Sequence, residues 1–186
     1  MRSSDLKDQL LVKDTIICDI DGTIANISHR LHFIKDRSGI VKKNPDWNSF
    51  NHACKNDKPI SDVIQVVKLL WSSRDSQTTP NFNLKFFTGR NTLVRENTLW
   101  WLTKHFFERE PSSQGQIGLL EELGVTLSMR DEDDFRDDCD VKLEMMQEFK
   151  LIPENVLCIF EDRQTVVDMW RNNGYRVMQV NSCNDR

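Results

Sequence analysis

The chain has 186 residues, of which 38% are hydrophobic and 29% charged, so it is long enough for one buried core and short for two. With 25 Lys and Arg against 29 Asp and Glu, its net charge of -4 argues against a protein that coats nucleic acid by bulk electrostatics. No apolar run approaches the ~20 residues that cross a bilayer. The first residues offer no apolar stretch for a signal peptide, so we expect a cytoplasmic protein that does not associate with membranes.

Short apolar runs rich in β-branched residues alternate along the chain with segments of helical period. The expected strands cover residues 15–20, 84–88, 124–129, 156–160 and 175–180. The expected helices cover residues 62–71, 93–107, 141–149 and 165–173. Continuous apolar strands that alternate with helices predict an α/β, Rossmann-like fold, with a mostly parallel sheet covered by helices on both faces.

One segment does not fit this alternation. Residues 24–59 are polar and aromatic, and they are long enough to fold over the edge of the sheet. We therefore expect a single domain over residues 1–186, with a small cap insertion at about residues 24–59.

Charged and hydroxyl residues follow several of the expected strands. In chain order they are Asp19, Asp21, Thr88, Arg90, Arg130, Glu161 and Asp162. Because ligands bind at the carboxyl ends of parallel strands, we expect these side chains to share one site.

The first of these groups is Asp19-Ile20-Asp21-Gly22-Thr23. Two aspartates one residue apart can approach the same point if the backbone turns, and Gly22 permits the turn. One carboxylate can then act as a nucleophile and the other as acid and base. Asp-Gly is also a common turn pair, so the two aspartates could instead hold a turn or cap a helix.

This pentapeptide resembles the first motif of the haloacid dehalogenase (HAD) superfamily, whose phosphatases form an aspartyl-phosphate on the first aspartate. Thr88-Gly89 resembles the second motif, Lys142 stands where the third-motif lysine would be, and Glu161-Asp162 matches the acidic fourth motif. The resemblance implies that Mg²⁺ is held by Asp19, Asp21 and Asp162. Taken singly, Lys142 could be a helix-surface lysine and Asp162 a helix cap.

The second half of the chain carries a narrower resemblance. Residues 130–142 are similar to the Arg-x3-Asp-x-Arg-x-Asp-x3-Lys signature of the phosphatase half of bacteriophage polynucleotide kinase-phosphatases. The matching residues are Arg130, Asp134, Arg136, Asp138 and Lys142. Residues 161–171, including Arg163, resemble a second block of these enzymes, with Glu161 in place of the usual aspartate. No Gly-x4-Gly-Lys-Ser/Thr loop occurs, so no kinase domain is expected.

The resemblance implies Mg²⁺-dependent hydrolysis of a phosphomonoester. Asp19 would attack phosphorus, Asp21 would protonate the leaving oxygen and activate water, and Thr88 and Lys142 would bind the transferred oxygens. A second group of candidates would bind substrate phosphate or fix the acids: Gly89, Arg90, Arg130 and Arg136. A third group would support the site: Asp134, Asp138, Glu161 and Arg163.

The implied substrate is a DNA or RNA end that bears a 3′-phosphate, and the implied location is the host-cell cytoplasm if the source is a virus. Catalytic residues do not define what lies beyond the phosphate, so a phosphatase for nucleotides or small metabolites is the alternative. A non-catalytic module that binds phosphorylated ends is a third hypothesis. The paired Asp19 and Asp21 count against it, because binding alone needs no nucleophile. The oligomeric state and the role of the cap stay open.

Overall fold

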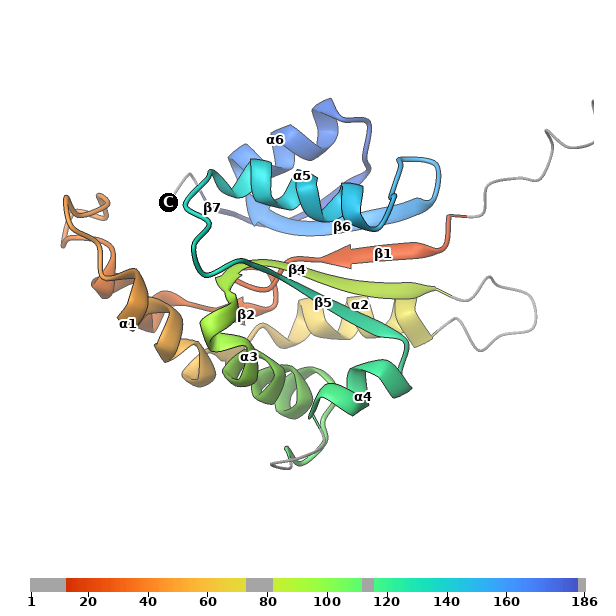
Figure 1. The fold of residues 1–186 in the computed structure, drawn as a ribbon, viewed down its shortest axis with the longest axis horizontal. Helices are drawn as coiled ribbons and strands as arrows, with labels where there is room; N and C mark the ends of the chain where they lie inside the picture. The colour runs from red at the N-terminus through yellow and green to blue at the C-terminus, as the bar shows by residue number, and fades with distance from the viewer. Residues whose placement is uncertain (1–12, 73–81, 112–115, 184–186) are drawn as a thin grey trace, which may run out of the picture.

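The computed structural model describes residues 13–72, 82–111 and 116–183. Its centre is a five-stranded sheet in the order β5-β4-β1-β6-β7, in which every pair of neighbouring strands is parallel (Figure 1). The strands are β1 (Thr15–Cys18), β4 (Asn83–Asn91), β5 (Val125–Arg130), β6 (Val156–Arg163) and β7 (Val177–Cys183). The order reverses at β1, so the carboxyl end of β1 lies where open parallel sheets place their ligands.

Helices cover both faces of this sheet. One face carries α2 (Ser61–Ser72), α3 (Arg95–Trp101) and α4 (Gln116–Glu122), and the other carries α5 (Asp138–Glu148) and α6 (Gln164–Asn172) (Figure 1). Alternate residues of β1 point to opposite faces: Ile16 and Cys18 pack with the first group of helices and Ile17 with the second. The sheet is therefore buried on both sides, which explains its continuous apolar strands.

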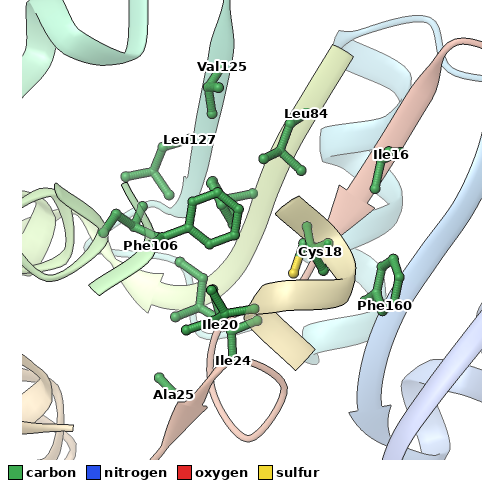
Figure 2. Packing of buried hydrophobic residues seen from close by; sticks show 14 of the residues in the cluster. Ile16, Cys18, Ile20, Ile24, Ala25, Leu84, Phe106, Val125, Leu127 and Phe160 are labelled. Atoms are coloured by element: carbon green, nitrogen blue, oxygen red, sulfur yellow. The ribbon is translucent and has the colours of Figure 1, made fainter. Parts of the chain in front are cut away.

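Aromatic residues fill the larger of the two cores. Phe106 is fully buried and meets Phe86 of β4 edge to face, with ring centroids 5.1 Å apart. Figure 2 shows Phe106 beside Leu127 of β5, and Cys18 and Ile20 in the same cluster. This core anchors the end of β1, from which the candidate catalytic loop begins.

Residues 24–59 lie outside the five-stranded sheet, at the end toward which its strands point (Figure 1). A two-stranded antiparallel ribbon of β2 (Ala25–Asn26) and β3 (Lys58–Pro59) closes this segment at its base. Between them lie the 3₁₀ turn η1 (Ser28–Phe33), the helix α1 (Trp47–His52) and the 3₁₀ turn η2 (Ala53–Asn56). We call residues 24–59 the cap.

The fold class predicted from the sequence is confirmed, and so is the presence of all five predicted strands. The helix expected over residues 93–107 is instead a 3₁₀ turn (Thr92–Val94), α3 and a π-helical turn (Leu102–Phe106). Within it, the hydroxyl of Thr103 donates to the carbonyl of Leu99 (2.8 Å), a bond that often bends helices. The sequence analysis did not predict α4. Among the described residues, no helix has the length and apolar character needed to cross a membrane.

Candidate active site

Asp19 comes directly after β1 and is 5% exposed. Its amide N–H donates to the carbonyl of Phe160 in β6 (3.0 Å), which fixes the backbone of Asp19 at the carboxyl end of the central strand. One carboxylate oxygen accepts from Lys142 Nζ (2.8 Å) and the other from the hydroxyl of Thr23 (3.0 Å). Burial raises the pKa of Asp19 to about 7, although Lys142 lowers it. A cation bound to this carboxylate would favour the charged form that a nucleophile requires.

Lys142 reaches Asp19 from the buried face of α5. The side chain of Asp137 caps this helix by accepting from the N–H of Cys139 (2.9 Å). The Lys142 ammonium also donates to Glu161 Oε2 (2.7 Å) and lies 3.5 Å from Asp138 Oδ2. Burial lowers the pKa of Lys142, but the three carboxylates outweigh this effect and hold its pKa well above the usual value. Lys142 therefore places a fixed positive charge beside Asp19.

Glu161 and Asp162 lie near the carboxyl end of β6, and each is 1% exposed. Single oxygens of Asp19, Glu161 and Asp162 lie within 4.8 Å of one another, so the three carboxylates could hold one metal ion. A buried set of carboxylate oxygens suits Mg²⁺, which prefers a few hard oxygen ligands and several waters. Glu161 has protein donors on both oxygens, namely Lys142 on Oε2 and the N–H groups of Asp162 and Arg163 on Oε1.

Two arginines hold Asp21 in the loop after β1. This loop turns at Gly22, whose φ of 90° is readily adopted only by glycine. Asp21 Oδ1 accepts from Arg30 Nη2 (2.7 Å) in the cap and from Arg90 Nε (2.8 Å) in β4. Burial alone would raise the pKa of Asp21, but the two guanidinium groups hold it well below its usual range. Asp21 is thus charged and ready to act as a base, whereas acting as an acid requires a proton that both arginines oppose.

A fourth charge completes this network. Asp57 of the cap is 2% exposed and accepts from Arg30 Nε (2.8 Å) and from Arg90 Nη2 (2.7 Å). His29 Nε2 also lies 2.9 Å from Asp57 Oδ1. Arg30 and Arg90 therefore join the cap to the sheet through the buried carboxylate of Asp57 and the partly exposed carboxylate of Asp21, and they set the position of Asp21.

The phosphatase domain of the polynucleotide kinase PNKP is the family whose model matches residues 13–184. The chain belongs to this family. A protein of Autographa californica nuclear polyhedrosis virus, named as a bifunctional polynucleotide kinase/RNA ligase, is 26% identical to this chain over 157 residues. That match covers 84% of this chain but only 18% of the viral protein, so the chain corresponds to a small part of it.

Solved structures show the same fold for this PNKP phosphatase domain. A chain in the Pnkp1/Rnl/Hen1 RNA repair complex superposes with a TM-score of 0.63 at 23% identity, covering 91% of this chain and 43% of that one. A HAD-like hydrolase from Streptococcus pneumoniae gives 0.54 at 14% identity, covering 91% and 84%. A phosphatase structure from Clostridium acetobutylicum gives 0.56 at 12% identity, covering 90% and 84%. These structures share the fold, and the family match identifies the chain as a HAD-type phosphatase domain.

In this phosphatase domain, Thr88 and Gly89 lie in β4 beside the acid cluster. Thr88 is fully buried and its hydroxyl accepts from the N–H of Arg90 (3.2 Å). A Cβ atom built at Gly89 would lie 2.6 Å from Asp138 Oδ1, so only glycine leaves room for the Asp138 carboxylate. Asp138, an aspartate of the signature at residues 130–142, therefore packs closely against Gly89 of the second motif.

The three arginines that the sequence offered for substrate phosphate all have partners within the protein. Arg90 is 1% exposed and is held by Asp21 and Asp57. Arg130 donates to the carbonyls of Gly89, Asp134 and Arg136 and to Asp138 Oδ1 (3.2 Å). Arg136 is exposed and forms ion pairs with Asp134 and Glu144. Of the two roles left open, fixing the acids fits these contacts better than gripping phosphate.

The supporting residues lie around the loop that joins β5 to α5. Arg136 holds Asp134 and lowers its pKa to about 2. Arg163 Nη1 lies 3.7 Å from Asp138 Oδ2. A groove of about 940 Å³ opens beside this loop, but carboxylates line it and it does not contain Asp19. Those carboxylates are Asp131, Asp133, Asp134, Glu144 and Glu148, so the groove does not suit a phosphate.

Sequence reasoning missed Arg30, Asp57 and Thr23 as parts of the site. Arg30 is fully buried and Asp57 nearly so, yet both come from the polar cap segment, where charged residues are normally exposed. Thr23 was seen only as part of the Asp-Gly-Thr motif, and its hydroxyl bridges Asp19 (3.0 Å) and Asp162 (3.5 Å). Hydrophobic periodicity cannot reveal buried ion pairs, because their burial depends on partners distant in sequence.

Proposed function

We propose that this domain removes 3′-phosphates from nucleic-acid ends, in a Mg²⁺-dependent reaction that passes through an aspartyl-phosphate on Asp19. One observation carries the proposal: Lys142 Nζ contacts both the buried carboxylate of Asp19 (2.8 Å) and that of Glu161 (2.7 Å). A carboxylate is a competent nucleophile once a fixed positive charge offsets the negative charge of the phosphate that approaches it.

The first step exchanges one bond to phosphorus for another. An oxygen of Asp19 attacks phosphorus in line and the bond to the leaving oxygen breaks. Asp21, which must first take up a proton against the effect of the two arginines, gives that proton to the leaving oxygen and so produces a free 3′-hydroxyl. Lys142 and the hydroxyl and amide groups at Thr88 and Gly89 bind the transferred phosphoryl oxygens.

The second step restores the enzyme. Asp21 takes a proton from a water molecule, whose oxygen attacks phosphorus and breaks the bond to Asp19, releasing inorganic phosphate. Arg30 and Arg90 favour the charged form of Asp21, which suits this step.

The carboxylates of Asp19 and Asp162 and the backbone carbonyl of Asp21 would hold the Mg²⁺. When bound, the ion would supply positive charge that stabilises the phosphoryl oxygens in the transition state. The protein itself provides only Lys142 as a cation in contact with Asp19 among the described ion pairs, which leaves most of the charge of a phosphate to be offset.

The polynucleotide substrate is proposed from the family match and from the names of two relatives, a kinase/ligase and a member of an RNA repair complex. The test compares phosphate release from a 3′-phosphorylated oligonucleotide, its 5′-phosphorylated twin, free nucleotides and an aryl phosphate. We expect the 3′-phosphorylated end to have the highest kcat/KM, and chelation to abolish release until Mg²⁺ is restored. Higher kcat/KM for free nucleotides would favour the small-molecule phosphatase.

The covalent mechanism is tested by Asp19→Asn, which keeps the shape of the side chain but removes the nucleophile. The matched control is Asp62→Asn, the same change on the exposed surface of α2. We expect no measurable turnover for the first variant and wild-type turnover for the second. Turnover of Asp19→Asn within tenfold of wild type would rule out the aspartyl-phosphate.

A further inference from the structure

Positive charge is concentrated in the cap of an otherwise acidic chain. Residues 24–59 hold seven Lys and Arg against three Asp, a net charge of +4 with histidines neutral, whereas the whole chain carries -4. Arg30 and Asp57 are buried in the active site and cancel, so the rest of the cap still carries +4. The two remaining acids hold local structure: Asp36 accepts backbone N–H groups in a turn and Asp46 caps α1.

An exposed aromatic ring lies within this basic surface. Trp47 begins α1 and is 51% exposed, and Lys42 and Lys43, a few residues before it, are also exposed. Two hydrogen bonds attach the segment that carries these residues to the end of η1. Lys42 Nζ donates to the carbonyl of His32 (2.7 Å) in η1, and the next carbonyl, that of Phe33, accepts from the N–H of Asp46 (3.1 Å). Lys42, Lys43 and Trp47 therefore belong to one short exposed segment that is held against η1.

A short series of contacts joins Trp47 to the active site. The indole meets the ring of Phe50 edge to face, with centroids 5.7 Å apart. The guanidinium carbon of Arg30 lies 4.1 Å from the centroid of the same Phe50 ring. Arg30 in turn donates to Asp21 (2.7 Å). Two side chains therefore separate the exposed indole from Asp21.

The loop across the site has the opposite charge. Residues 131–137, which join β5 to α5, contain five acids and one arginine, a net charge of -4. A phosphate backbone that leaves Asp19 is repelled by this loop and attracted by the cap. Exposed aromatic rings beside cations are the surface that single strands use, because their bases are free to stack.

We propose that the cap binds the single-stranded segment that precedes the terminal phosphate, with a base stacked on Trp47 and backbone phosphates at Lys42 and Lys43. The proposal rests on the proposed function for the position of the 3′-end. The shared chemistry is that of a single strand, DNA or RNA, since neither the ring nor the two ammonium groups read a 2′-hydroxyl.

The test measures binding of fluorescent single-stranded DNA and RNA 10-mers with 3′-hydroxyl ends to the full chain, which needs no turnover. Trp47→Ala should weaken binding about 10-fold, the range expected for loss of one stacked base, and Trp47→Phe should restore most of it. The matched control is Phe135→Ala, which removes the 91% exposed ring of the acidic loop and should leave binding unchanged. Equal losses for Trp47→Ala and Phe135→Ala, or equally tight binding of a blunt duplex, would overturn the proposal.

The lysines are tested by Lys42→Gln/Lys43→Gln against Lys13→Gln/Lys150→Gln, which removes the same charge from the amino end of the sheet. The slope of log affinity against log salt concentration should fall by about 1.4 for the cap pair, since each single-strand phosphate contact contributes about 0.7. The control pair should leave the slope unchanged, and equal slopes for all three proteins would overturn the assignment of the lysines.

Phosphate release separates this proposal from the proposed function. Trp47→Ala should raise KM for a 3′-phosphorylated 10-mer and leave kcat/KM for an aryl phosphate within twofold. If the cap variants lose binding but wild type releases no phosphate from oligonucleotides, the proposed function falls and the cap site stands. If wild type releases it and Trp47→Ala matches wild type on every substrate, the cap site falls and the function stands.

Discussion

The cap and the loop of residues 131–137 both lie at the carboxyl end of the sheet, but their charged residues are placed differently (Figure 1). In the cap, Arg30 is fully buried between Asp21 and Asp57, and the six other basic residues lie outside this network. The loop sends Arg136 outward, where it is paired with Asp134 and Glu144 and half exposed. Arg30 is therefore buried in the candidate active site, whereas Arg136 forms exposed ion pairs on the surface of the loop.

This difference bears on the polynucleotide substrate that we propose, because the chain as a whole is acidic. Long-range repulsion from a net charge of -4 is weak at physiological salt, because exposed charges are screened within about 8 Å. What matters is the sign of the charge nearest the substrate, which is positive in the cap and negative in the loop. The comparison yields four predictions, of which the first changes the cap and the last changes the loop.

The largest effect is expected from Arg30→Ala. It leaves the buried carboxylate of Asp57 and the partly exposed carboxylate of Asp21 with Arg90 as their remaining arginine, and removing one partner of a buried charge costs about 3–5 kcal/mol. We expect that loss of unfolding free energy in chemical denaturation and at least a 100-fold loss of kcat on oligonucleotide and aryl phosphates. Arg136→Ala, the control in the loop, should stay within threefold of wild type. Similar losses in both variants would show that the two arginines do not differ in role.

The second largest effect is expected from the acid pair Glu161 and Asp162. Asp162→Ala should raise the Mg²⁺ concentration for half-maximal activity by about 10-fold or more, because it removes a metal ligand. Glu161→Ala should raise it less, since both Glu161 oxygens already accept from protein donors. Titration of activity with Mg²⁺ after chelation measures both values, and the reverse ranking would mean that Glu161 is the ligand.

A smaller effect is expected from Gly89→Ala, which tests how closely Gly89 of β4 packs against Asp138 at the start of α5. The new methyl group would lie 2.6 Å from Asp138 Oδ1, and relieving such overpacking costs about 1–3 kcal/mol. We expect that loss in thermal or chemical unfolding, together with reduced kcat from displacement of Asp138 away from Lys142. Gly118→Ala in α4 is the control, since nothing lies within 4 Å of its Cβ position. Unchanged stability and kcat in Gly89→Ala would refute the close packing.

The smallest effect is expected from lowering the negative charge of the loop. Asp131→Asn/Asp133→Asn should raise kcat/KM for 3′-phosphorylated oligonucleotides about two- to threefold at low salt, because repulsion of the incoming strand weakens. The gain should vanish at high salt, where screening removes the effect, and kcat/KM for an aryl phosphate should stay the same. A gain that survives high salt would point to a local change instead of electrostatics.

The site was predictable from the sequence to the extent that each residue stood in a motif next to a strand. The sequence brought Asp19, Thr88, Lys142 and Asp162 together by their order along an α/β chain, and the structure places Lys142 in contact with Asp19 and Asp162 in the same acidic cluster. Their chemical roles stay predictions. The arginine contacts were not predictable, because Arg30 and Asp57 are 27 residues apart and neither follows a periodic pattern.

The sequence by itself determined the fold class and the family, because continuous apolar strands require a sheet buried on both faces and because the motif spacings are local. Only the tertiary structure decided that Arg90 is buried against Asp21 and Asp57, and that Glu161 binds Lys142. Local periodicity records which face of an element is apolar. Ion pairs between distant residues depend on how their segments pack in space, and local sequence patterns do not define the distances between those segments.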